Sequence, residues 1–403
     1  MNLHGKEPLV MLISSSVGAG HNQAAVAIMD ALKSTGLNAE IEMLDALDFV
    51  PSWFSVIYAG GYKMLVTKFP ELYGWGYRIS NQPKGSQRTP GERMRLQVEW
   101  YALRKLRKYL LERRPTLVLA THYLATPMIG RLINDSLPAL RMLTVITDNE
   151  SHRFWYAQNV EKWFVANKKV RDEIIAWDIE PKRIIISGIP VHKKWTTPLD
   201  KEKVLRDWNL PPDRPIVILT GGAHFTVGPI EQIARGILST SNAHLIVLTG
   251  ANKRLLARMA RWPQAGKRMT LISFTNLLNE LCGLASVVIT KAGGLITSEC
   301  IARGVPMVLT RPVPGQEAAN AELLAREGAA LVASTAWQVV QNVKYLLESD
   351  ELSQTVCTNA RRLFKPATDT IVSTVIEMIQ QPASHADSTI DTTSALVDEI
   401  HTG

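Results

Sequence analysis

One stretch of the chain, residues 289–320, combines a glycine turn with polar side chains in an order that favours phosphate and sugar binding. Gly293 and Gly294 follow an apolar strand and precede a helix, so backbone N–H groups and a helix N-terminus could approach phosphate oxygens. Glu299 comes about one turn into this helix, where its carboxylate could accept hydrogen bonds from ribose hydroxyls. The polar loop that follows could hold a hexose through Gln316, Glu317 and Asn320. The pattern predicts a nucleotide-sugar site; the alternative is an ordinary βαβ unit with a well-capped helix.

A second glycine turn, residues 14–21, follows the first apolar strand and ends in a histidine. It lacks the Gly-Lys-Ser/Thr of a Walker loop and is not a complete dinucleotide fingerprint. A glycine turn before a helix, here with Gly20, still makes an anion site. His21 could accept a proton from an incoming hydroxyl, or could only cap or pack the helix.

Two further polar residues end predicted strands, at the sheet edge where α/β proteins place their ligands. Asp148 follows the strand over 141–147 and could act as a base, orient a histidine, bind an acceptor hydroxyl or cap a turn. His122 follows the strand over 117–121 and has a similar but weaker claim.

Apolar runs alternate with helical periods through most of the chain, which predicts an α/β protein with parallel sheets covered on both faces. The predicted strands are 9–14, 39–44, 117–121, 141–147, 162–166, 184–187, 216–220, 244–249, 269–273, 287–290, 307–310 and 330–332. The predicted helices beside them include 23–34, 126–134, 168–177 and 229–239.

The strand–turn pattern restarts after a proline-rich stretch near residue 200, where the strand over 216–220 runs into a new phosphate turn, Gly221-Gly222. Phe274 and Thr275 follow a later strand and could present backbone groups to a base, or simply end the strand. We therefore predict two Rossmann-like domains that face each other across a cleft. Their expected bounds are 1–190 and 191–380, with a disordered Ser/Thr/Asp-rich tail over 381–403.

Composition indicates a globular protein: 403 residues, 46% hydrophobic, with a mean hydropathy near zero. We find no apolar run of about 18 residues and no signal-peptide pattern at the N-terminus, so we expect a cytoplasmic location. The three cysteines have no metal-ligand spacing and are expected to serve packing in a reducing compartment.

The positive charge is concentrated in one segment, residues 51–115, which is predicted to interrupt the first domain and to contain a basic helix over 92–111. It has 13 Lys/Arg and 4 Asp/Glu, a net charge of +9, and 11 of the 27 aromatic residues; the rest of the chain has 32 basic and 33 acidic residues. Basic and aromatic residues together suit single-stranded nucleic acid or an anionic membrane surface.

Several motifs occur in a fixed order along the chain. They are Gly18-Ala-Gly-His21, the aromatic stretch 62–75, Thr147-Asp148 with His152 and Trp155, Gly188-Ile-Pro-Val191, Thr290-Lys-Ala-Gly293, and 314–320. In this combination the chain resembles the family of monogalactosyldiacylglycerol synthases and processive diacylglycerol glucosyltransferases over roughly residues 8–380. A more distant likeness is to the N-acetylglucosaminyltransferase that makes lipid II.

The resemblance implies a GT-B glycosyltransferase that moves a hexose from a UDP-sugar with inversion and without a metal or other cofactor. His21 would be the base, with Asp148 as helper or alternative. Glu299 would hold ribose and the 316–320 residues the sugar. Gly20, Gly221, Gly222, Gly293 and Gly294 would lie near the diphosphate, with Lys291 adding positive charge.

The resemblance also implies that the insertion touches an anionic membrane and admits a lipid acceptor, most simply diacylglycerol. This role explains its composition better than nucleic-acid binding, and predicts a peripheral enzyme on the cytoplasmic side of the membrane. The residues assigned to acceptor and membrane are Trp53, Tyr62, Lys63, Trp75, Arg104, Lys105 and His122. The alternatives are another lipid-linked or soluble acceptor, or a catalytically silent membrane-binding relative.

Three departures from the family pattern concern the sugar and the acceptor rather than the fold. Ser16 stands where plant-type members tend to have Asp, and the donor turn reads Gly-Gly-Leu-Ile rather than Gly-Pro-Gly-Thr. His152 is followed by Arg153 where relatives usually have proline. The choice between glucose and galactose stays open.

Overall fold

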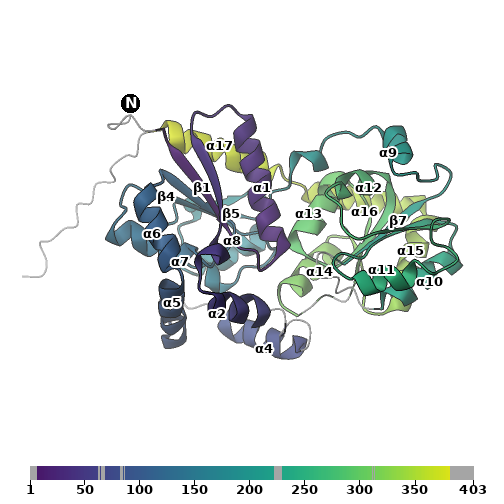
Figure 1. Ribbon diagram of the computed structural model, residues 1–403, viewed down its shortest axis with the longest axis horizontal. Helices are drawn as coiled ribbons and strands as arrows, with labels where there is room; N and C mark the ends of the chain where they lie inside the picture. Colours follow the sequence, from purple (N-terminus) through teal and green to yellow (C-terminus); the bar gives the residue numbers. More distant parts are fainter. Residues whose placement is uncertain are drawn as a thin grey trace, which may run out of the picture.

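The computed structural model describes residues 7–61, 64, 69–81, 85, 87–221, 229–310, 312 and 314–381. Within them the chain forms two α/β units side by side (Figure 1). The predicted site residues Tyr62, Lys63 and Gly222, and the predicted tail from residue 382 onward, lie outside the described residues.

The first unit is built on a six-stranded parallel sheet in the order β2-β1-β3-β4-β5-β6. Its strands are β1 (Leu9–Ser14), β2 (Glu40–Asp45), β3 (Leu117–Ala120), β4 (Arg141–Val145), β5 (Lys162–Val165) and β6 (Ile184–Ile186). The central strands are buried along their whole length because helices cover both faces, which is why they read as continuous apolar runs.

The second unit has its own six-stranded parallel sheet in the order β12-β11-β10-β7-β8-β9. Its strands are β7 (Ile216–Thr220), β8 (His244–Leu248), β9 (Met269–Ile272), β10 (Ala285–Thr290), β11 (Met307–Thr310) and β12 (Leu331–Ala333). The predicted class of two parallel sheets is therefore confirmed, and each predicted strand overlaps an observed one.

In both sheets the strand order reverses next to the first strand, between β1 and β3 and between β7 and β10. Loops leave the sheet in opposite directions at such a point, so a crevice forms at the carboxyl ends of the strands. The turn before His21 follows β1, and the turn containing Gly293 follows β10. Both glycine turns therefore lie at the places where this architecture binds ligands.

The helices and short helical turns cover the faces of the two sheets and form the insertion. In the first unit they are α1 (Ala19–Ser34), η1 (Ala46–Phe49), α2 (Ser52–Ser55), η2 (Val56–Gly60), α4 (Pro70–Ser80), α5 (Pro90–Ala102), α6 (Arg104–Arg113), α7 (Thr126–Asp135), η3 (Arg153–Trp155), α8 (Lys168–Ile175) and η4 (Pro181–Arg183). The connection and the second unit contain η5 (Lys193–Trp195), α9 (Lys201–Asp207), α10 (Ile230–Thr240), α11 (Lys253–Met259), α12 (Leu278–Leu284), α13 (Gly294–Arg303), α14 (Gln316–Arg326), α15 (Ala336–Glu348), α16 (Asp350–Leu363) and α17 (Ala367–Gln380).

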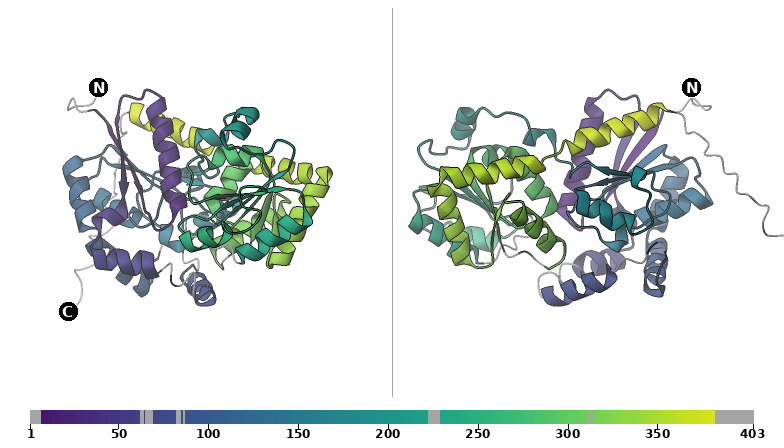
Figure 2. Two further views of the ribbon diagram at one scale, coloured as in Figure 1. Left: turned by 45° about the vertical axis from the view of Figure 1, so that its right-hand side comes forward. Right: turned by 180° about the vertical axis from the view of Figure 1, so that it is seen from behind.

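The last helix, α17, returns to the first unit, although the predicted bounds placed residues up to 380 in the second. Figure 2 shows it running from the second unit across the back of the first. Its apolar face, Ile371, Val372, Val375 and Met378, joins the core formed by β1, β3 and β4. Burying each such side chain contributes roughly 1.5–3 kcal/mol, so α17 fastens the two units together.

The predicted single helix over 92–111 is wrong, because the chain breaks at Leu103 (φ −85°, ψ 15°) into α5 and α6. After the break, Leu106 and Leu110 pack with Leu103 in the first core. The helix α5 extends away from that core, and with α2 and α4 it forms the lower edge of the molecule in Figure 1. Among the helices of the described residues, none combines the length and apolar character needed to span a bilayer.

Candidate active site

A cavity of about 410 Å³ lies where the turn after β1, the helix α4 and the start of α14 meet. Its walls are mainly aromatic and apolar. Its polar groups come from three histidines, His21, His122 and His152, from the hydroxyls of three tyrosines, and from Ser80 and Gln316. An apolar chamber with a few convergent polar groups is typical of a binding site for a partly apolar ligand.

His21 is placed in this cavity by the first turn of α1, with a hydrogen-bond geometry that sets its tautomer. Its Nδ1 lies 3.1 Å from the Thr121 carbonyl oxygen and 2.7 Å from the Thr147 hydroxyl. A carbonyl oxygen can only accept, so Nδ1 carries the proton and the Nε2 lone pair is left free. Burial lowers the pKa of His21 to about 4, against a smaller opposing effect of the Thr121 hydrogen bond, so the ring is neutral at pH 7.

His122 packs edge-on against His21, with ring centroids 4.7 Å apart, and is buried rather than part of a membrane surface. Its Nδ1 accepts a hydrogen bond from the Leu124 backbone N–H at 3.1 Å, so the neutral ring carries its proton on Nε2. Burial, followed by the proximity of His21, lowers the pKa of His122 well below 6.5. Because its Nδ1 is already engaged and its Nε2 carries the proton, His122 can donate a hydrogen bond in the cavity but has no free lone pair to accept a proton.

His152 has a different function, because both of its ring nitrogens are engaged. Nδ1 accepts from the Phe154 backbone N–H at 3.1 Å, and Nε2 lies 3.0 Å from the Ser80 hydroxyl at the end of α4. That hydroxyl in turn donates to the Gly76 carbonyl at 2.7 Å. His152 therefore holds the end of α4 against the loop after β4.

Asp148 lies at the interface between the two units rather than in the wall of the cavity. Gly294, the first residue of α13, lies against the start of the loop after β4. A Cβ at this position would come within 2.3 Å of the Thr147 carbonyl oxygen and 3.1 Å of the Asp148 carboxylate. Only glycine fits this approach. Burial, and next the nearby Glu317, raise the pKa of Asp148 to about 7, with Lys291 opposing the shift.

The N-terminus of α13 is thus presented at the boundary between the units. Gly293 is its N-cap, and no side chain caps the N–H groups of its first turn. Across the boundary, a Cβ on Gly20 would lie 3.5 Å from Leu295. The two glycine turns predicted from the sequence are therefore brought together. The N-terminus of α13, which lies at this contact, can accept an anion.

The three predicted donor residues of α14 make different contacts. Glu317 forms an ion pair with Lys291 at 2.8 Å, and Gln316 lines the cavity. Asn320 is fully buried: its Oδ1 accepts from the Asn149 backbone N–H at 3.0 Å, and its Nδ2 donates to the Ala292 carbonyl at 2.8 Å. Asn320 therefore links the loop after β4 to the turn after β10.

A second group of predicted donor residues gathers around Lys194 in the connection between the units. Burial raises the pKa of Glu299 to about 8, while Lys194 acts in the opposite direction. Lys194 Nζ also donates to the Asn276 carbonyl at 2.8 Å, which brings the loop after β9 to the same place. In that loop Phe274 is 71% exposed and Thr275 precedes Asn276. Gly221 is buried at the end of β7.

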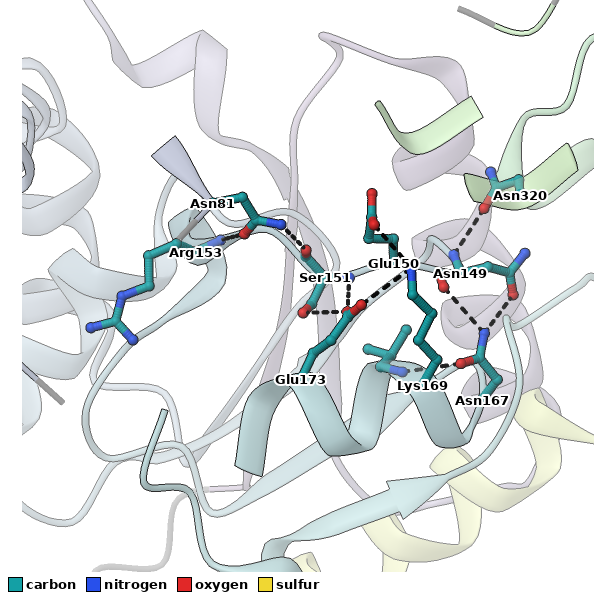
Figure 3. A network of polar contacts seen from close by, with 10 residues as sticks. Asn81, Asn149, Glu150, Ser151, Arg153, Asn167, Lys169, Glu173 and Asn320 are labelled. Carbon is teal, nitrogen blue, oxygen red and sulfur yellow. Dashed lines mark hydrogen bonds and ion pairs between the residues drawn. The ribbon is translucent and has the colours of Figure 1, made fainter. Parts of the chain in front are cut away.

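A network of polar contacts connects the end of α4 with α14 through the loop after β4 (Figure 3). Asn81 donates to the Ser151 carbonyl at 2.9 Å and accepts from the Arg153 N–H at 2.7 Å. Glu173 of α8 accepts from the backbone N–H and the hydroxyl of Ser151, at 2.7 and 2.8 Å. The loop continues to Asn149, which meets Asn320. This network fixes the loop that carries Asp148.

Arg153, noted in the sequence only as a departure from the family pattern, is a buried anchor for the insertion. Its guanidinium pairs with Glu92 at 3.2 Å, donates to the Gln87 carbonyl at 3.1 Å and lies 3.9 Å from the centroid of the Tyr156 ring. Glu92 also completes the capping box with Thr89 at the start of α5. No sequence pattern indicated this role, because Glu92 is 61 residues away.

The remaining predicted surface residues lie on the insertion. Trp53 and Trp75 are exposed on α2 and α4, and Trp75 also lines the cavity. Arg104 and Lys105 are exposed at the start of α6. Sequence reasoning missed the tyrosines of the cavity wall, Tyr58, Tyr77 and Tyr123.

Comparison with known proteins connects this geometry to a chemistry. The family model described as monogalactosyldiacylglycerol (MGDG) synthase matches residues 21–191, and that of the glycosyltransferase family 28 C-terminal domain matches residues 216–369. A processive diacylglycerol beta-glucosyltransferase of Staphylococcus aureus (strain MRSA252) is 26% identical over 377 residues, which cover 92% of this chain and 93% of that protein.

Solved structures share the fold at low sequence identity. MurG of Acinetobacter baumannii superposes with a TM-score of 0.58 at 16% identity, covering 92% of this chain and 99% of that one. The S. aureus MnaA–UDP structure gives a TM-score of 0.62 at 14% identity, covering 94% and 99%. The glycotransferase of kitacinnamycin gives 0.64 at 14% identity, covering 93% and 100%. The predicted GT-B fold is confirmed.

Proposed function

The chain belongs to the monogalactosyldiacylglycerol synthase type of family 28 glycosyltransferases and is a hexosyltransferase of glycolipid synthesis; on this premise we propose that it moves a hexose from a UDP-sugar to the free hydroxyl of diacylglycerol, with inversion. The observation that carries the proposal is a neutral His21 with a free Nε2 in an apolar cavity beside the N-terminus of α13.

In the proposed reaction the lipid hydroxyl enters the 410 Å³ cavity and gives its proton to His21 Nε2 as its oxygen attacks C1 of the hexose. The bond from C1 to the UDP oxygen breaks on the opposite face, so the configuration at C1 inverts. His122, with its proton on Nε2, supplies a hydrogen bond that can orient the hydroxyl. Asp148 is the alternative base, but it lies outside the lining of that cavity.

The leaving diphosphate would be stabilised by the uncapped N–H groups at the start of α13 and by Lys291. For Lys291 to act in this way, its ion pair with Glu317 has to open, which would release Glu317 toward the sugar together with Gln316. Asn320 is proposed to position these groups rather than to bind the sugar directly, since both ends of its amide are engaged. The proposed mechanism uses no metal ion.

At the other end of the donor, Glu299 would hold the ribose, and the loop with Phe274 and Thr275 would receive the uracil. Their shared neighbour Lys194 supports this grouping. The lipid would come from a membrane contacted by the exposed side chains of α2, α4 and α5, with the enzyme attached peripherally at the cytoplasmic face.

The proposal is tested by UDP release from a panel of UDP-sugars, with and without diacylglycerol in anionic vesicles. We expect release to require both one UDP-hexose and the lipid, because the base removes a proton that only the acceptor supplies. Turnover that is indifferent to the lipid would instead place the acceptor among soluble or lipid-linked sugars. No turnover with any donor, from protein that still binds the vesicles, would contradict the enzymatic proposal for diacylglycerol.

A further inference from the structure

A second cavity, of about 180 Å³, lies on the first unit between α5 and α7 and shares no lining residue with the first. Three arginines, Arg88, Arg93 and Arg131, contribute to its wall. Its volume is below the roughly 300–1,000 Å³ of pockets for drug-sized ligands, so it suits a small group rather than a nucleotide or an acyl chain.

The positive charge of this pocket is not fully neutralised. The acid in the wall, Glu99, is buried and paired with Arg95 at 2.6 Å. Two further acids nearby are also engaged: Glu92 with Arg153, and Asp135 with Arg131 at 3.1 Å. Within the described part of the chain, no ion pair is recorded for Arg88 or Arg93. Burial, and to a smaller extent the positive charges of Arg153 and Arg95, lower the pKa of Arg88, against the opposing effects of Tyr156 and Glu92.

The indole of Trp100 in the pocket wall supports one of the three pocket arginines, Arg131, and also stacks with Arg107, which lies outside the pocket lining. The guanidinium carbon of Arg131 lies 4.1 Å from the indole ring centroid, and that of Arg107 from α6 lies 4.3 Å from it. A stacked guanidinium keeps its N–H groups available in one plane, and such forks match the oxygens of a phosphate in a bidentate manner. The chemistry of the pocket therefore favours a phosphate group.

The same helix indicates where that phosphate would come from. Met94, Val98 and Tyr101 recur at helical spacing on α5 and are 71%, 44% and 60% exposed. Each follows a pocket residue by one position (Arg93, Gln97 and Trp100), so the apolar stripe and the pocket occupy neighbouring faces of α5. An exposed apolar stripe beside basic residues is the arrangement of a helix lying in a membrane interface, with the cations at the level of lipid phosphates.

We propose that the pocket formed by Arg88, Arg93 and Arg131 beside Trp100 binds the phosphate of one anionic lipid headgroup, separately from the active site. This proposal rests on the proposed membrane attachment, but not on the reaction. Binding one headgroup in this pocket, beside the membrane-facing stripe of α5, would fix the orientation of the enzyme on the bilayer.

The test is equilibrium binding of the full chain to phosphatidylcholine vesicles with and without phosphatidylglycerol, in the absence of any UDP-sugar. The double variant Arg88→Gln/Arg93→Gln is compared with Arg254→Gln/Arg261→Gln, which removes the same charge from exposed positions in α11 and just after it, in the second unit. The variant Arg88→Lys/Arg93→Lys keeps the charge but lacks the planar guanidinium groups that can bind a phosphate in a bidentate manner. Thermal unfolding of each variant establishes that it is folded.

We expect the glutamine pair to weaken binding to phosphatidylglycerol vesicles about 30-fold, since each basic residue at an anionic surface contributes about 1 kcal/mol. The lysine pair should also bind more weakly than wild type, and the α11 pair should bind as wild type does. A glutamine pair that binds as wild type does would overturn any role of these arginines in membrane binding. A lysine pair that binds as wild type does, beside a weakened glutamine pair, would overturn the pocket and leave only diffuse attraction.

Inorganic phosphate titrated into the wild-type protein separates the two sources of the ligand. Phosphate binding that is lost in the glutamine pair, with vesicle binding unchanged, would make the pocket a free-phosphate site and overturn the lipid assignment. Because these assays contain no sugar donor, a failure here is distinguishable from a failure of the glycosyl transfer.

Discussion

Replacing His21 with alanine is expected to lower kcat by about 10²–10⁴-fold, the usual contribution of a positioned general base, with a much smaller change in the KM of the donor. The reason is that the Nε2 lone pair is the free basic group of this histidine in the cavity, while Nδ1 is held by Thr121 and Thr147. Steady-state rates of UDP release measure the effect. Asp148→Asn is the comparison, and it should retain far more activity than His21→Ala.

The pH dependence of kcat/KM distinguishes the two candidate bases in the unmodified enzyme. A base must be unprotonated, so activity falls as the pH drops through the pKa of the free enzyme's base. Glu299 is already protonated below its pKa of about 8, so with His21 as base the profile below that pH should stay level down to about pH 5 and fall near the His21 pKa of about 4. A fall already near pH 7 would instead identify Asp148, whose pKa is raised to about 7, and would contradict the assignment of His21.

Replacing Glu299 with alanine is expected to raise the KM of the UDP-sugar by about 10–100-fold, because leaving a buried hydrogen-bond partner unsatisfied costs about 1–3 kcal/mol. Burial raises the pKa of Glu299 to about 8, so the carboxyl is largely protonated at pH 7 in the free protein. Glu299→Gln, a neutral mimic of that form, should therefore lose less than the alanine variant.

The matched control for this experiment is Glu322→Ala, which removes an exposed carboxylate from α14 outside the proposed site. Its donor KM should equal that of wild type. A wild-type KM in Glu299→Ala would show that Glu299 does not contact the donor, and the ribose would then have to be placed elsewhere in the cleft.

The sheets and the glycine turns were predictable because their signals are local. Fully buried parallel strands such as β1 and β7 are continuous apolar runs, and the turns at Gly18 and Gly293 directly follow strands. The joining of the two turns at Gly294 was implied only by the family resemblance. Its physical reason, the approach of the Thr147 carbonyl, depends on contacts between residues far apart in the sequence.

The features that the sequence did not predict depend on such distant contacts. The return of α17 to the first sheet is decided by which apolar face is left uncovered there, and the helical period of α17 does not reveal it. Asn320 lies in a polar loop-to-helix stretch that suggests sugar binding, yet its partners are backbone groups at 149 and 292. The break at Leu103 has no proline or glycine to mark it, and follows from the packing of α6 in the first core.

The central claim is most directly tested by the structure of the lipid product formed from the UDP-hexose and diacylglycerol. Proton NMR of the purified glycolipid gives the anomeric coupling constant and the position of the linkage. The account predicts a hexose in β-linkage to the glycerol hydroxyl, because attack on C1 opposite the α-linked UDP inverts that centre. An α-linked product would contradict inversion through His21, and a hexose that never appears on the lipid would contradict the proposed acceptor.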